Sequence, residues 1–306
     1  MKHYSALKSE AIDGLQIKDD GVYVDATLGY AGDASEILKR IKRGKLFAFD
    51  RDEEALKYSD KVLQKLGNSY TLIHSDFIHL KEKLYELGVE KVDGILFDLG
   101  VSSPQLDENR GFSFMRNEIL DMRMDRSSDI TAENIVNEYS YEKLKNIFYQ
   151  YGEEKQSALI AKKIVEVRKN KEIETTQELC EIICSAVGAK YYYKTHPERN
   201  IFQAIRIEVN NELTDLENVL PDAISLLKPK GRLVVITFHS LEDRIVKQVF
   251  KKYSEVDKVV KGLPNIPLEY QPLIKIINKN PITPSEQELE ENTRSRSAKL
   301  RIVERI

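Results

Sequence analysis

Four apolar runs in the N-terminal third of the chain each end in an aspartate. These aspartates are Asp25, Asp50, Asp76 and Asp98. If the runs are parallel strands, their carboxyl ends meet at one edge of a sheet, which is where such sheets bind ligands. Negative charges gathered there repel a pyrophosphate and attract a ligand that carries a cationic centre. The pattern therefore predicts a site for a cationic ligand rather than for a dinucleotide.

The segment after the first aspartate, TLGYAGD, contains Gly29 and Gly32. Glycines in such a turn let the backbone approach a ligand closely. Their spacing is not G-x-G-x-x-G, so a nicotinamide-dependent oxidoreductase is disfavoured. Asp50 either binds a ribose hydroxyl pair, as an acid does in nucleotide-binding sheets, or caps the next helix. S-adenosylmethionine has a ribose, an ammonium and a sulfonium, so it meets these requirements.

The loop after Asp98, GVSSPQLD, has no cysteine, histidine or lysine and so no obvious nucleophile or strong base. A reaction there needs an electrophile that arrives activated, which the sulfonium of S-adenosylmethionine is. Ser102 and Ser103 either orient the group that receives the methyl or serve only as turn residues.

The pattern from residue 20 to 100 alternates apolar strands with helices, which indicates a doubly wound parallel α/β sheet. From about Pro104 to Thr195 the sequence reads as helices without a central strand, which indicates a helical insertion. The α/β pattern then resumes. Its strand RLVVITFHS brings His239 to the edge of the sheet where the aspartates lie, and two further strands follow near the C-terminus.

The composition fits a soluble globular protein, with 41% hydrophobic and 32% charged residues. The apolar runs are shorter than the ~20 residues that span a bilayer, and the N-terminus lacks the apolar core of a signal peptide. A cytoplasmic protein without membrane contact is expected. Cys180 and Cys184 have no second pair of ligands at metal-binding spacing, so they are expected to be small buried side chains and not a metal site.

Seven segments, taken together, resemble the RsmH (MraW) family along almost the whole chain. The segments are DATLGYAGDASEIL, AFDRDEEAL, DGILFDLGVSSPQLDENRGFSFMRNEILDMRMD, YGEE, FQAIRIEVNNEL, ITFHSLEDRIVK and RSRSAKLRIVER. The family consists of bacterial enzymes that methylate the exocyclic amine of a decoding-centre cytidine in small-subunit ribosomal RNA. The resemblance implies a class I (Rossmann-like) S-adenosylmethionine-dependent methyltransferase with an inserted helical domain. The expected domains are residues 1–106 and 198–306 for the methyltransferase core and residues 107–197 for the insertion.

The resemblance also implies the residues of the site. Those for the cofactor, S-adenosyl-L-methionine, are Ala31, Gly32, Asp33, Asp50, Phe77, Asp98 and Gln105. The places of Ser102, Ser103 and His239 after two strand ends, and not the resemblance, make them the candidates for catalysis; His239 either contacts substrate, sheds a proton or braces the following helix. The family usually has a histidine where this chain has Asp33. An anion there could pair with the ammonium of the cofactor but would repel its carboxylate.

Arginines in the long loop after Asp98 and near the end of the insertion are candidates for holding RNA phosphates. They are Arg110, Arg116, Arg123 and Arg199. The expected partner is small-subunit ribosomal RNA, either naked or in the assembled subunit, while the oligomeric state stays open. The alternative is a catalytically silent, ribosome-associated binding protein on a methyltransferase fold, which Asp33 alone supports.

Overall fold

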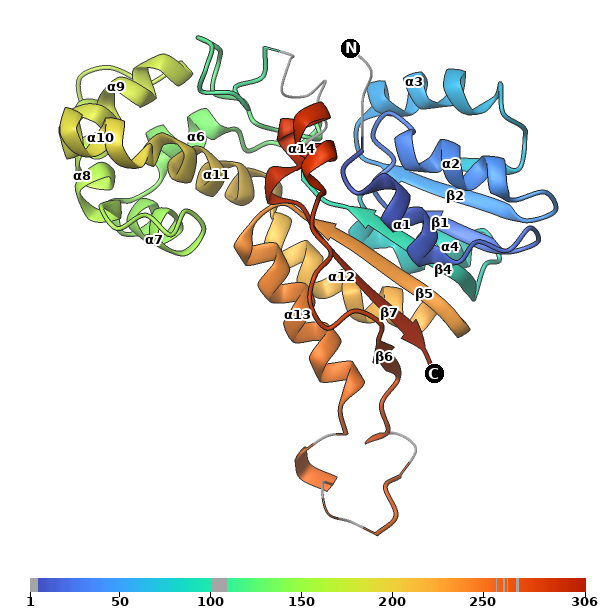
Figure 1. The fold of residues 1–306 in the computed structure, drawn as a ribbon. Helices are drawn as coiled ribbons and strands as arrows, with labels where there is room; N and C mark the ends of the chain where they lie inside the picture. The colour runs from blue at the N-terminus through green and yellow to red at the C-terminus, as the bar shows by residue number, and fades with distance from the viewer. Residues whose placement is uncertain (1–4, 101–108, 257, 261, 263, 268–269) are drawn as a thin grey trace. The chain divides into compact units, whose positions relative to one another are not determined.

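The computed structural model describes residues 5–100, 109–256, 258–260, 262, 264–267 and 270–306. The chain divides into two compact units (Figure 1). Unit 1 consists of Met1–Gly100 and Leu213–Ile306, and unit 2 of Val101–Glu212.

Unit 1 is built on a seven-stranded sheet with the order β3-β2-β1-β4-β5-β7-β6. The strands are β1 (Val22–Asp25), β2 (Lys45–Asp50), β3 (Tyr70–His74), β4 (Val92–Asp98), β5 (Leu227–Thr237), β6 (Ile274–Ile276) and β7 (Lys299–Arg305). Neighbours among β1 to β5 pair in parallel, which confirms the predicted doubly wound sheet. β7 lies between β5 and β6 and runs antiparallel to both. The chain order reverses between β1 and β4, so the expected ligand edge is beyond their carboxyl ends.

Helices cover both faces of this sheet (Figure 1). They are α1 (Lys8–Leu15), α2 (Gly32–Arg40), α3 (Glu53–Leu63), α4 (Leu80–Glu86), α12 (Glu212–Leu226) and α13 (Ser240–Ser254), with α14 (Glu286–Glu291) near the C-terminus. Side chains alternate along each strand. In β2, Phe47 belongs to the apolar layer under α4, α12 and α13, and Leu46 to the layer under α1, α2 and α3. Two apolar layers therefore fix the sheet and hold the last residues of the parallel strands β1 to β5 at the ligand edge.

Unit 2 is helical and has its own apolar core. Its helices are α6 (Ala132–Glu138), α7 (Tyr141–Gln150), α8 (Ser157–Val167), α9 (Thr176–Val187), α10 (Ala189–Thr195) and α11 (Pro197–Asn210). Hydroxyl side chains at Thr131, Ser140 and Thr175 accept hydrogen bonds from the first turns of α6, α7 and α9.

The predicted end of the insertion after residue 197 differs from the observed boundary of unit 2. Ile201, Phe202 and Ile205 of α11 are buried in the core of unit 2, so the whole helix belongs to that unit. Local sequence does not show which of two apolar cores the buried face of α11 joins.

Two further expectations concern membrane-spanning helices and the cysteines. Among the described residues, no helix combines the length and the apolar character that crossing a membrane requires. Cys180 and Cys184 lie on α9 as free, half-buried thiols. Burial raises the pKa of the Cys180 thiol to about 11, so its reactive thiolate form is rare at neutral pH.

Candidate cofactor and active site

The turn between β1 and α2 has an unusual backbone. Gly29 has φ +49° and Ala31 has φ +62°, both in the left-handed region, which a non-glycine residue rarely adopts. A side chain at Gly32 would place its Cβ 2.3 Å from Ser5 Oγ, so any other residue there requires the Ser5 hydroxyl to move. The predicted glycine turn is therefore in close contact with Ser5 at Gly32.

Asp50 at the end of β2 holds this turn. Its carboxylate accepts a hydrogen bond from Gly29 N at 2.8 Å and another from Asp52 N at 2.8 Å. Burial raises the pKa of Asp50 to about 6, although both backbone donors favour the charged form. Asp52, not Asp50, caps α3, because its side chain accepts from Glu54 N. The helix-cap interpretation of Asp50 is therefore wrong.

Asp25, Asp33 and Asp98 form a group of buried carboxyls at the ligand edge. Burial, followed by the charge of Asp33, raises the pKa of Asp25 to about 8. Burial raises the pKa of Asp33 to about 6, opposed by the Ser5 hydroxyl and by Lys8. Burial and then the charges of Asp33 and Asp25 hold the pKa of Asp98 well above its ordinary value.

Two atoms of this group have no hydrogen-bond partner among the described residues. They are Oδ1 of Asp33 and Oδ1 of Asp98, both of which are buried. A buried carboxylate oxygen without a donor is costly, and a cationic ligand at this edge would supply the missing charge or donor. Asp76 contrasts with this pair, because it forms an ion pair with Arg51 at 3.0 Å and caps the short 3₁₀ helix Phe77–His79.

Phe77 follows Asp76 and stands half-buried against the sheet. Its ring meets the ring of Phe97 edge-on, with centroids 5.7 Å apart and planes at 80°. This edge-to-face packing fixes the Phe77 ring beside the carboxyl end of β4. Nearby, Asp98 N donates to Thr27 Oγ1 at 2.7 Å, which ties the end of β4 to the turn after β1.

His239 begins α13 at the end of β5. Its Nδ1 accepts a hydrogen bond from Glu242 N at 3.4 Å, and the Glu242 carboxylate in turn accepts from His239 N at 3.2 Å. This reciprocal pair is a capping box, so His239 braces the following helix. His239 Nε2 lies 3.2 Å from Glu242 Oε1. Contact of His239 with substrate stays a prediction.

A sequence model of the MraW methylase family matches residues 1–306, the full length of the chain. The chain belongs to the MraW methylase family. Membership and the seven-stranded sheet together confirm the predicted class I methyltransferase fold. The methyl donor of this methylase is S-adenosyl-L-methionine.

Three solved structures are similar along their whole length but distant in sequence. An rRNA methylase from Streptococcus thermophilus is 14% identical, with 97% of this chain and 95% of that chain covered and a TM-score of 0.43. A putative rRNA-methylase from Clostridium thermocellum is 13% identical, with 100% of both chains covered and a TM-score of 0.47. A putative methyltransferase from Streptococcus mutans in complex with SAH is 13% identical, with 100% of both covered and a TM-score of 0.44.

The site of this MraW-family methylase fits the donor chemically. The unpartnered oxygens of Asp33 and Asp98, where these carboxyls are ionised, match the positive charge of a sulfonium or an ammonium. Asp50 is anchored by two backbone donors, which leaves its remaining acceptor capacity for hydroxyl groups. Ala31, Gly32 and Phe77 supply a close backbone turn and an apolar ring. Ser102, Ser103 and Gln105 lie outside the described residues, so their roles stay predictions.

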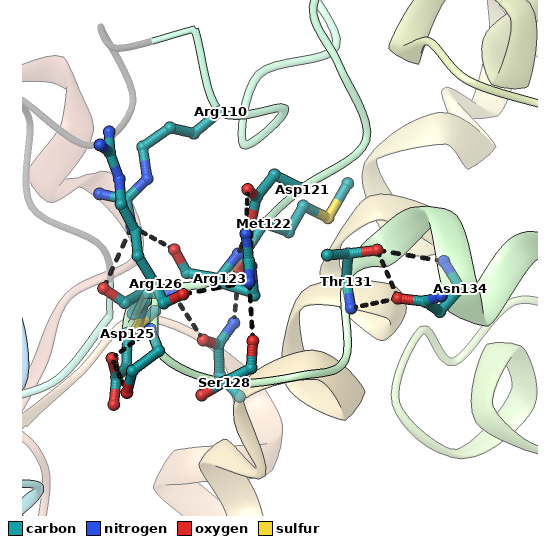
Figure 2. A network of polar contacts seen from close by, with 12 residues as sticks. Arg110, Asp121, Met122, Arg123, Asp125, Arg126, Ser128, Thr131 and Asn134 are labelled. Carbon is teal, nitrogen blue, oxygen red and sulfur yellow. Dashed lines mark hydrogen bonds and ion pairs between the residues drawn. The ribbon is translucent and has the colours of Figure 1, made fainter.

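The four candidate arginines of unit 2 have different environments. Arg110 is buried and donates to the carbonyls of Arg123 and Met124. Arg123 forms a two-pronged ion pair with Asp121, at 2.8 and 2.9 Å, and also donates to two carbonyls of its own loop (Figure 2). Arg116 and Arg199 are exposed. Arg110 and Arg123 thus organise the loop, and RNA contact by any of the four stays a prediction.

Sequence reasoning missed residues that act through others. Glu242 is buried and its charge contributes to the raised pKa of Asp98. Thr27 Oγ1 accepts a hydrogen bond from Asp98 N, and the Ser5 hydroxyl is hydrogen-bonded to the Asp33 side chain. The capping-box spacing from His239 to Glu242 was a local signal that could have identified Glu242. The partners of Thr27 and Ser5 lie far away in sequence, so no local pattern indicates them.

Proposed function

We propose that this protein transfers the methyl group of S-adenosyl-L-methionine to the exocyclic 4-amino group of a decoding-centre cytidine of 16S ribosomal RNA. The transfer is direct and forms no covalent intermediate with the enzyme. The observation that carries the proposal is the pair of buried carboxyls, Asp33 and Asp98, each with one oxygen that lacks a partner among the described residues. Such a pair favours a cationic donor over a neutral or anionic ligand.

Each residue has a defined task in this proposal. The donor supplies an activated methyl group, so the protein needs to bind, orient and exclude water. Asp50 accepts hydrogen bonds from the ribose hydroxyls of the donor, and Asp33 pairs with its ammonium. Phe77 contacts the adenine base of the donor. Ser102 and Ser103 accept the hydrogens of the target amine and hold its nitrogen in line with the methyl carbon.

Ribosomal RNA is the proposed substrate because the family resemblance of the segment from Asp98 to Asp125 points to it. Of the solved structures with a similar fold, one is described as an rRNA methylase and another as a putative rRNA-methylase. The cytidine has to leave its stack to reach the donor, and an inserted helical unit gives such a methylase additional surface for the surrounding RNA. Naked RNA and the assembled small subunit are both tested as substrates.

The deciding experiment combines binding and product analysis. Calorimetry with S-adenosylmethionine is expected to show one binding site in the wild type and a loss of roughly tenfold or more in affinity for Asp50→Ala. The matched control is Asp60→Asn, a substitution at an exposed position of α3, the helix that Asp52 caps. This variant is expected to bind S-adenosylmethionine as the wild type does. Ribosomal RNA from cells that lack the protein is then mapped by mass spectrometry. A decoding-site cytidine that kept its amine methyl group would remove the substrate assignment.

A silent binding protein is the second candidate, and Asp33 in place of the family's usual histidine favours it. It predicts that small subunits bind while S-adenosylmethionine does not. Calorimetry separates the two, because heat of binding at the cofactor site is incompatible with this candidate.

A further inference from the structure

Ser59 lies in the buried stripe of α3, between the apolar residues Ala55, Leu56 and Leu63. Its side chain is fully buried, at 0% exposure. A hydroxyl in such a stripe needs a hydrogen-bond partner, and a helical serine usually finds one on the preceding turn of its own helix. Ser59 instead donates to the carbonyl of Gly29 at 2.8 Å, on the turn after β1. This hydrogen bond therefore connects α3 to the turn between β1 and α2.

Gly29 is held on its other side by Asp50. Its N–H donates to Asp50 Oδ2 at 2.8 Å, and its φ of +49° is one that L side chains rarely adopt. Asp50 Oδ1 accepts from Asp52 N, and Asp52 is the N-cap of α3. The contacts close a ring that runs from α3 through Asp52, Asp50, Gly29 and Ser59 back to α3.

This ring fixes the orientation of the Asp50 carboxylate. The two backbone donors occupy one lone pair on each oxygen of Asp50, and the position of one donor depends on the Gly29 peptide. Without the Ser59 hydroxyl, the Gly29 carbonyl would lose this donor and the turn could rotate. The Asp50 carboxylate would then lose its fixed orientation.

We propose that Ser59 is a positioning residue for ribose recognition in the cofactor site. The inference rests on the proposed function, because it takes Asp50 as the ribose acceptor. It predicts a specific defect: loss of the Ser59 hydroxyl weakens the preference for a ribose over a deoxyribose, while contacts to the amino-acid end of the cofactor persist.

The test compares two ligands in the full-length protein by calorimetry, S-adenosylhomocysteine and its 2′-deoxy analogue. The wild type is expected to prefer the ribose form. Ser59→Ala is expected to bind the ribose form about 3- to 10-fold more weakly and the deoxy form almost as the wild type does. Ser59→Thr keeps the hydroxyl and is expected to restore the preference. Ser59→Cys is slightly larger, has only a weak donor, and replaces the alanine variant if that variant does not fold.

Two controls give each outcome a meaning. Ser225→Ala removes a helical hydroxyl that bonds only within its own helix, to the carbonyl of Asp222, and is expected to change neither affinity. Equal losses for both ligands in Ser59→Ala, or no loss, would overturn the role of Ser59. Asp50→Ala tests the proposed function separately, because unchanged affinity for the ribose form would overturn the cofactor site itself.

Discussion

Burial, and after it the negative charge of Asp33, raises the pKa of the Asp98 carboxyl, although Asp33 lies in the first turn of α2 and Asp98 ends β4. Each of the two has a buried Oδ1 without a partner among the described residues. Lys8 and Ser5 oppose the effect at Asp33, while Asp25 and Glu242 add to it at Asp98. The site thus contains repulsion that a bound cation would relieve.

Donor binding is expected to depend on pH through these carboxyls. The pKa values of Asp33 and Asp50 are both about 6, so both groups gain protons as the pH falls below that value. The site then loses negative charge, and its affinity for the sulfonium of S-adenosylmethionine falls. S-adenosylhomocysteine has no sulfonium and serves as the comparison. The affinity ratio of the two, measured by calorimetry, is expected to favour the sulfonium about threefold or more at pH 8 relative to pH 5. A ratio independent of pH would contradict the charge argument.

Asp98→Asn is expected to stabilise the free protein at alkaline pH. A carboxyl whose pKa is raised by folding contributes stability that is complete below its unfolded pKa and is lost as the pH rises through its folded pKa. The asparagine variant never ionises, so its unfolding midpoint is expected to exceed that of the wild type by roughly 2–4 °C at pH 8 and to match it near pH 4.

Asp93 provides a control of opposite sign on the same strand. Hydrogen bonds from Lys228, Val22 N and Lys18 hold its pKa below the ordinary value against the effect of burial. Asp93→Asn is therefore expected to lower the midpoint at neutral pH, where Asp98→Asn raises it. If both variants lowered the midpoint at pH 8, the result would contradict a raised pKa for Asp98. Scanning calorimetry across pH provides the measurement.

Gly32→Ala is expected to disturb the turn through Ser5. The new Cβ would stand 2.3 Å from Ser5 Oγ, whereas Ser5 Cβ is 3.6 Å away. The hydroxyl has to move and gives up Asp33, so stability is expected to fall by about 1–3 kcal/mol and donor affinity with it. Adding Ser5→Ala removes the clashing oxygen and is expected to recover part of the stability. Purely additive losses in the double variant, measured by denaturant unfolding, would contradict this contact.

Arg123 and Arg199 are expected to differ in what they support. Arg123 bonds Asp121 and the carbonyls of Arg126 and Ser128, so Arg123→Met is expected to destabilise unit 2 by about 1–3 kcal/mol (Figure 2). Arg199 is exposed on α11, so Arg199→Met is expected to leave stability unchanged. If Arg199 contacts a phosphate, that variant weakens RNA binding and lowers the salt slope by about one. Unfolding curves and salt-dependent RNA binding check the two, and an unchanged slope would remove Arg199 from the RNA surface.

Local sequence patterns were sufficient for the sheet and for the edge that carries the candidate ligand site. The apolar runs that end at Asp25, Asp50 and Asp98 are strands, and each ends at the carboxyl edge. The turn with Gly29 and Gly32 lies where the pattern predicted it. These features depend on periodicity and on glycine's freedom, which neighbouring residues encode.

Long-range partners were not predictable in the same way. Asp76 belongs to the same pattern as Asp98, yet Arg51 neutralises it. The loop arginines Arg110 and Arg123 looked like phosphate ligands, yet both bond their own loop. A charge in a sequence gives no indication of which groups the fold will bring beside it.

The amino-acid sequence by itself determined the order of strands and helices, the acidic character of the ligand edge and the family to which the chain belongs. Only the tertiary structure decided which carboxyls lack a counter-charge, that Ser59 supports Gly29, and that α11 joins the core of unit 2. The reason is physical. Periodicity is a property of neighbouring residues, whereas burial, pKa and hydrogen bonding depend on groups that come together only when the chain has folded.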